Sequence, residues 1–272
     1  MLISFFLFIL AFILCRGASY VVGKTWGWEG LKAYHCISTP IHEACHALTS
    51  MFFGHKITRF APYLFDKTTG LAGVVEFTYN KNSIFQIIGL FFSAIAPFLM
   101  GGTLVIAIAF FSFSNPEDFT LQLAYIKYIF ISYTEGQLSN FSLFSIFSYF
   151  WGEFKLLFYI LFSYENLTSI KFFLGFIVVF LITPSIMPSR HDIIQVSFFI
   201  ASIFISFFIF FNWLAVKFIH IPQSVVDTTI GLNFYIFLTS ALVCFFLFLN
   251  FLIIVTGAAT FTLLKKIKKV AT

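Results

Sequence analysis

Residues 38–58, STPIHEACHALTSMFFGHKIT, combine an apolar helical pattern with two histidines and a glutamate. His42 and His46 are four residues apart, and Glu43 directly follows the first of them. On an α-helix this spacing places both imidazoles on one side, where they can bind one metal ion. The pattern HExxH is typical of zinc sites in which the glutamate acts as general base. The stretch therefore predicts Zn²⁺ as cofactor, His42 and His46 as metal ligands, and Glu43 as catalytic base.

The rest of the chain is mostly apolar. Of its 272 residues, 60% are hydrophobic and only 10% are charged, whereas soluble domains carry about 25% charged residues. An integral membrane protein is the class that fits this composition. A charged side chain at mid-membrane costs roughly 2.5–3.5 kcal/mol on insertion scales. Three polar groups on one membrane helix therefore favour a functional site over the alternative, a chance occurrence of the pattern.

The apolar runs predict an all-α polytopic membrane protein of about six transmembrane helices, organised as a single domain, 1–272. The expected spans are 2–21, 31–53, 84–113, 170–187, 193–219 and 232–264. We read 2–21 as a retained span, with a cleaved signal peptide as the alternative. A β-hairpin is expected at 56–80, between the second and third spans, because β-branched residues alternate around a turn-like DKTTG. Region 114–168 is predicted to be interfacial or half-inserted, although a further span within it stays open.

The basic residues predict an orientation. The tail LLKKIKKVAT follows the last span and indicates a cytoplasmic C-terminus, so six spans place the N-terminus there too. The Phe-, Ile- and Lys-rich composition favours a multi-pass protein of a bacterial inner (plasma) membrane. No basic surface accompanies the tail, so nucleic acid is not an expected partner. The cysteines show no CxxC spacing and are expected to be reduced packing residues.

Two histidines do not complete a catalytic zinc site, which usually has three protein ligands. The candidates for the third are Asp66, Glu76, Asp227, His55, His191 and Asp192. Asp192 is favoured because the segment TPSIMPSRHDII is expected on the same side of the membrane as the end of 31–53. Pro184 and Pro188 break the helix there, and broken helices at membrane depth occur where they line a cavity. The alternative role of Asp192 is the N-cap of the following span.

HEACHALTSMFFGHKI, the later SAIAPFLMGG and the Pro-rich turn ending in SRHD together resemble the site-2 protease family of intramembrane zinc metalloproteases. The resemblance covers about 35–105 closely and 180–195 loosely. It implies His42, His46 and Asp192 as metal ligands, Glu43 as base, and a membrane protein substrate within the lipid bilayer. The chain departs from the family pattern at Ala96, where glycine is common, and at PSRHDI, where the aspartate lacks its usual neighbours.

Other functions stay open from the sequence. A non-catalytic metal-binding scaffold, a transporter component and a zinc hydrolase acting on lipid all accommodate a membrane-embedded histidine pair. The sequence assigns no substrate-binding residues. The edge of the expected hairpin is a candidate surface for holding an extended substrate by strand addition.

Overall fold

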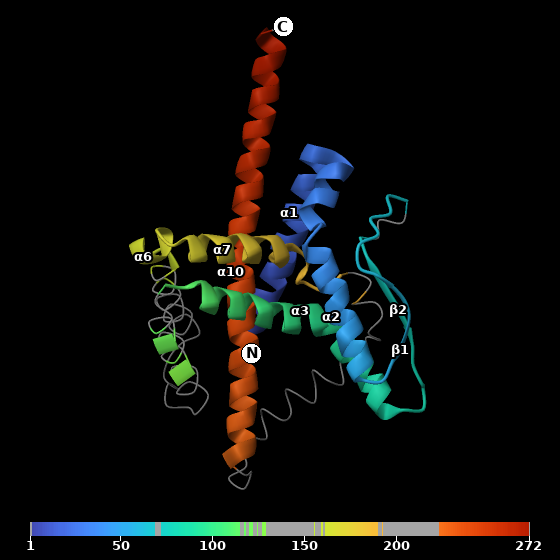
Figure 1. Cartoon of the computed structure of the whole chain (residues 1–272). Helices are drawn as coiled ribbons and strands as arrows, with labels where there is room; N and C mark the ends of the chain where they lie inside the picture. The colour runs from blue at the N-terminus through green and yellow to red at the C-terminus, as the bar shows by residue number, and fades with distance from the viewer. Residues whose placement is uncertain are drawn as a thin grey trace. The chain divides into compact units, whose positions relative to one another are not determined.

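The computed structural model describes residues 2–68, 72–114, 161–189, 192 and 223–271, with isolated positions between 115 and 160. The chain is mostly helical and contains a small two-stranded antiparallel sheet (Figure 1). The contacts group the residues into two compact units, and the single domain expected from the sequence stays a prediction. The first comprises Met1–Val105, Val179–Ser202 and Thr239–Thr272, and the second Ile106–Val178 and Ile203–Leu238. All residues of the candidate site lie in the first unit.

Within the described residues, three helices are long and apolar enough to cross a membrane. Their candidate spans are Leu7–His35 in α1 (Leu2–His35), Ile84–Ser112, which is α3, and Phe234–Ile267 in α10 (Gln223–Ala271). Large apolar side chains on these helices face outward; Ile13 is 59% and Phe111 68% exposed. Lipid tails accommodate such side chains, whereas water does not. The prediction of a membrane protein is therefore supported, and the third predicted span matches α3 closely.

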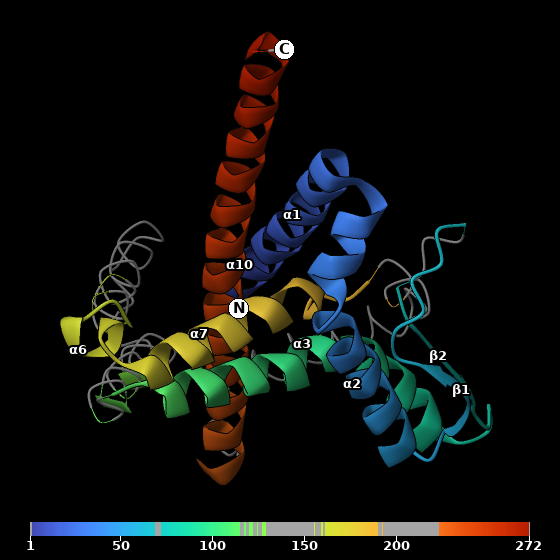
Figure 2. The same ribbon diagram turned by 45° about the horizontal axis from the view of Figure 1, so that its top comes forward.

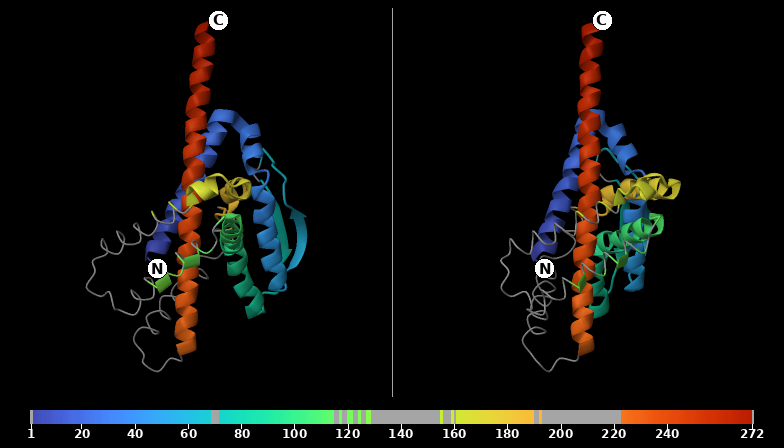
Figure 3. Two further views of the ribbon diagram at one scale, coloured as in Figure 1. Left: turned by 60° about the vertical axis from the view of Figure 1, so that its left-hand side comes forward. Right: turned by 90° about the vertical axis from the view of Figure 1, so that its left-hand side faces the viewer.

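Two of the six predicted spans are not matched by membrane-spanning helices among the described residues, and a third is not described. Helix α1 does not end near Gly23 but kinks at Gly27, whose φ is 69°, and continues to His35. Figures 2 and 3 show this sharp turn, which brings the end of α1 to the start of the next helix. Helices α2 (Ser38–Phe52) and α7 (Ile170–Ile182) have 15 and 13 residues, fewer than the roughly 20 needed to span. The predicted span 193–219 lies outside the described residues.

A glycine ends α2 and turns the chain into the sheet. Gly54 has φ 76°, and its N–H donates to Met51 O, while the His55 N–H donates to Ser50 O. These two bonds form a Schellman motif, in which the residue with positive φ is usually glycine because it has no Cβ. The chain therefore leaves α2 abruptly at Gly54, and β1 begins two residues later.

The sheet consists of β1 (Lys56–Ala61) and β2 (Val74–Thr78), which pair antiparallel inside the predicted range 56–80. A bulge between Ile57 and Arg59 shifts the register, and Arg59 then faces Glu76, with 3.2 Å between Nη1 and Oε1. Both strands contact α2 and run beside it (Figures 1 and 3). Of the predicted interfacial region 114–168, the structure describes one short helix, α6 (Tyr164–Leu167), and a few neighbouring residues.

Candidate metal centre

Helix α2 presents a buried polar stripe with a spacing of four residues. Two serines from other parts of the chain, Ser185 and Ser93, each contact one histidine and one serine of this stripe. The Ser185 carbonyl accepts from His42 Nδ1, and the Ser185 hydroxyl lies 2.8 Å from that of Ser38. The Ser93 carbonyl lies 2.7 Å from His46 Nδ1, and the Ser93 hydroxyl 2.8 Å from that of Ser50. The stripe consists of Ser38, His42, His46 and Ser50.

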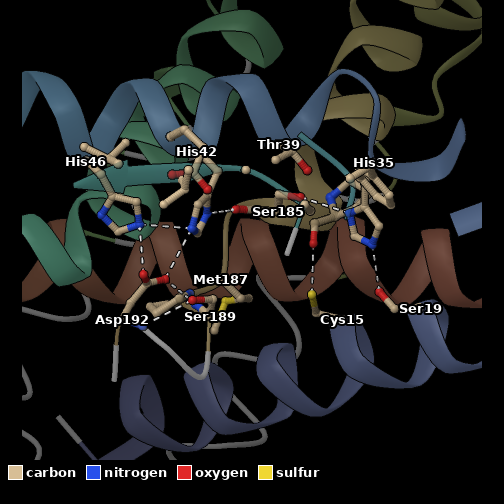
Figure 4. A pocket seen from close by; sticks show the side chains of 18 of the residues that line it. Cys15, Ser19, His35, Thr39, His42, His46, Ser185, Met187, Ser189 and Asp192 are labelled. Carbon is tan, nitrogen blue, oxygen red and sulfur yellow. Dashed lines mark hydrogen bonds and ion pairs between the residues drawn. The ribbon is translucent and has the colours of Figure 1, made fainter. Parts of the chain in front are cut away.

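The two imidazoles meet the Asp192 carboxylate at one point (Figure 4). Their Nε2 atoms are 3.0 Å apart. Asp192 Oδ2 lies 3.2 Å from His42 Nε2, and Oδ1 lies 3.2 Å from His46 Nε2. The exposed fractions of the three residues are 7%, 7% and 9%. A buried group of two nitrogens and a carboxylate could hold a metal ion.

The hydrogen bonds to the far side of each ring test whether this group fits a cation. Both Nδ1 atoms face backbone carbonyls, which only accept, so both Nδ1 atoms carry the ring proton. A ring that is also protonated at Nε2 donates to Asp192, whereas neutral rings, the form that ligates a metal, direct their Nε2 lone pairs at each other and at the carboxylate. Three such acceptors this close repel one another unless a positive ion lies among them. The anchoring of ring N–H groups by carbonyls is also the usual arrangement behind histidine metal ligands.

Asp192 is fixed by a local hydrogen-bond exchange with Ser189. The Ser189 N–H donates to Asp192 Oδ2 at 2.5 Å, and the Asp192 N–H donates to Ser189 Oγ at 3.2 Å. This reciprocal pair has the form of a capping box, in which Ser189 is the N-cap and Asp192 the third residue after it. The structural role expected for Asp192 and its place among the histidines are therefore compatible, although the cap itself is Ser189.

The carboxyls of Asp192 and Glu43, outside the three candidate spans, have shifted pKa values. Burial raises the pKa of Asp192, but hydrogen bonds from His42 and His46 outweigh it and hold the pKa well below its usual range. Burial raises the pKa of Glu43, against the opposing charges of the two histidines. Asp192 is therefore anionic, while the pKa of Glu43 moves in the direction that suits a general base near neutral pH.

Glu43 lies at the wall of a cavity of about 880 Å³ that also contains the three-residue group. It is 9% exposed, and its carboxylate makes no hydrogen bond to any residue the structure describes. Gly73, just before β2, packs directly on the Glu43 side chain. The cavity runs on past β2 to α1, so the site faces a volume larger than a metal ion and water require. Its lining includes Cys15, His35, Val75, Phe77, Met187 and Pro188.

The other candidates for the third ligand bind different partners or lie outside the described residues. Asp66 accepts from the N–H and hydroxyl of Thr68 in a turn. Glu76 pairs with Arg59, and His55 Nε2 bonds the carbonyl of Gln86. His191 and the side chain of Asp227 lie outside the described residues.

Sequence reasoning missed the residues that orient the ligands: Ser93, Ser185 and Ser189. One signal in the sequence indicates Ser189, and a second predicts that the polar face of α2 has buried polar partners. SRHD matches the S-x-x-D form of a capping box. The repeat of polar residues at every fourth position from Ser38 to Ser50 marks a buried polar face rather than a histidine pair alone.

Comparisons of the chain with protein-family models, with curated proteins and with solved structures find no match.

Proposed function

We propose that this protein is an intramembrane zinc metallopeptidase, which hydrolyses a peptide bond in or near a transmembrane segment of a membrane protein substrate. The observation that carries the proposal is the convergence of His42, His46 and Asp192 beside Glu43 in one cavity. Three protein ligands with a neighbouring carboxylate and open volume are the arrangement of catalytic zinc sites, whereas structural zinc sites are closed by four protein ligands.

Zinc suits the spacing of the donor atoms. Zinc bonds nitrogen and oxygen at about 2.0–2.1 Å, so two ligands of a tetrahedral ion lie about 3.3 Å apart. The two Nε2 atoms are 3.0 Å apart, and each lies 3.2 Å from a different oxygen of Asp192. One ligand atom from each residue lies within 4.8 Å of the other two. Two imidazoles and a carboxylate also suit zinc, a borderline-soft ion, better than calcium or magnesium, which prefer oxygen ligands alone. When bound, zinc supplies Lewis acidity toward water and the scissile carbonyl.

In this proposal the chain's own residues move the protons and hold the substrate. Glu43 takes a proton from the attacking water at a carboxylate oxygen and passes it to the leaving amine. The buried ligands fix the reaction geometry, because both rings and Asp192 are held by hydrogen bonds to neighbouring segments. Residues Val74–Phe77 of β2 line the cavity, so this strand is a candidate for binding an unwound substrate by strand addition.

The test compares wild type with Glu43→Gln. Both proteins are purified, their zinc content is measured, and each is incubated with a panel of single-span membrane proteins whose fragments are identified by mass spectrometry. Glu29→Gln is the matched control, since it makes the same chemical change at an exposed glutamate of α1 outside the cavity. A protease loses cleavage in Glu43→Gln while keeping its metal, and Glu29→Gln cleaves like wild type.

The rival functions give different results. A metal-binding scaffold or transporter component binds zinc in all three proteins and cleaves nothing. A lipid-directed hydrolase leaves the panel intact but releases lipid products in a Glu43-dependent way. Absence of zinc from purified wild type, even after metal is supplied, would remove the basis of the proposal.

A further inference from the structure

The carbonyl that anchors His46 is free because of a proline. Pro97 lies inside α3 and has no N–H, so the carbonyl four residues earlier lacks its α-helical donor. That carbonyl belongs to Ser93, and it accepts the His46 Nδ1 hydrogen bond at 2.7 Å. Ser93 is 2% exposed, so its carbonyl is buried away from water. An unpaired carbonyl there is costly, and the histidine ring supplies the missing donor.

Pro184 shows the same relationship in the same unit. It follows α7 and frees the carbonyl of Phe180, which accepts from Asn250 Nδ2 at 3.2 Å. In both cases a side chain from a distant segment donates to a carbonyl that a proline has left without its helical partner. Of the two carbonyls, only that of Ser93 bonds a residue of the metal group.

We propose that Pro97 is a positioning residue for the metal centre. By removing one N–H from α3 it reserves the Ser93 carbonyl for His46. The bond keeps the ring proton on Nδ1 and the Nε2 lone pair directed at His42 and Asp192. Alanine at position 97 restores the N–H, which forms the helical bond to Ser93 and competes with the imidazole. This inference rests on the proposed zinc site, but it concerns binding of the metal rather than peptide hydrolysis.

The experiment changes one atom group at position 97. The full chain is made by cell-free synthesis into lipid nanodiscs, with proline, alanine or lactic acid at this position. Lactic acid is the hydroxy-acid counterpart of alanine: it has the same methyl group but an ester oxygen in place of the N–H. Zn²⁺ affinity is measured by competition with a chelator of known affinity, and the Co²⁺-loaded proteins are compared by visible absorption. Thermal unfolding checks that all three proteins fold.

We expect Pro97→Ala to weaken Zn²⁺ binding by about tenfold, the lower end of the effect of losing a partner behind a metal ligand. Its Co²⁺ absorption band shifts as well. The lactic acid protein has no N–H and binds Zn²⁺ within about twofold of wild type, on the same reasoning.

Two results would overturn the inference alone. In the first, the alanine variant binds Zn²⁺ as tightly as wild type. In the second, the lactic acid variant binds Zn²⁺ as weakly as the alanine variant, which assigns the effect to loss of the proline ring. A wild-type protein that binds neither Zn²⁺ nor Co²⁺ overturns the inference together with the proposed function.

Discussion

Gly73→Ala is the substitution that separates metal binding from catalysis most sharply. A Cβ at position 73 would lie 2.6 Å from Glu43 Cγ and 3.0 Å from Cδ and Oε1, whereas ordinary contacts begin at 3.4 Å. These three nearest atoms all belong to Glu43, so the clash is relieved by displacing its carboxylate or the start of β2 by about 1 Å. A misplacement of that size costs on the order of 100-fold in rate.

We therefore expect Gly73→Ala to cleave about 100-fold more slowly than wild type while keeping its zinc. The assay measures the initial rate of fragment formation from a substrate of the wild-type protein, and zinc content is measured in the same preparation. Gly257→Ala is the matched control, because its added methyl group would lie 3.8 Å from the Trp26 ring, an ordinary contact.

Two outcomes would refute this reasoning. A Gly73→Ala protein that cleaves like wild type would mean that the position of Glu43 does not govern the rate. Loss of zinc along with cleavage would mean that the substitution displaces the metal ligands as well as the Glu43 carboxylate.

Three further predictions concern the ligands and the packing around them. Asp192→Ala should weaken Zn²⁺ binding by more than about 100-fold, because loss of an outer partner alone costs 10–100-fold; chelator competition measures this, and an unchanged affinity would exclude Asp192 as a ligand. Asn250→Ala removes the partner of the Tyr34 hydroxyl and of the Phe180 carbonyl. This substitution should lower the free energy of unfolding by about 1 kcal/mol and leave Zn²⁺ affinity unchanged. A free energy of unfolding equal to that of wild type would argue against a stabilising role for these two hydrogen bonds. Zn²⁺ affinity should fall as the pH is lowered, since protons compete with the metal for the histidine nitrogens; a Zn²⁺ affinity that does not change with pH would contradict histidine ligation.

The sequence predicts the local part of the site well because that part depends on one helical turn. The spacing of His42 and His46 is sufficient to place both rings on one side of α2, whatever surrounds the helix. The capping-box pattern of Ser189 and Asp192 and the helix-ending Gly54 are local in the same sense. Composition likewise indicates a membrane protein, since the share of apolar residues depends on whether lipid or water surrounds the chain and not on how the chain folds.

The lengths of the helices could not be read from apolar runs alone. The run around α2 continues to Phe53, yet the helix begins only at Ser38, after a turn at Cys36 and Ile37. Helix α1 continues past the kink at Gly27 to His35, so it includes residues that hydropathy assigns to the second span. Hydropathy records whether residues are apolar, but it does not record where backbone hydrogen bonding is interrupted.

By itself, the sequence determined the membrane class, the histidine pair and the carboxylate beside it, because these follow from composition and from the period of an α-helix. Only the tertiary structure decided that Asp192, among several acidic and histidine candidates, meets the rings, and that Ser93 and Ser185 orient them. The distances between those segments are set by packing of helices far apart in the chain, which no local spacing encodes. The contact of Gly73 with Glu43 has the same origin, and so does the pairing of the carbonyls freed by Pro97 and Pro184 with donors from other helices.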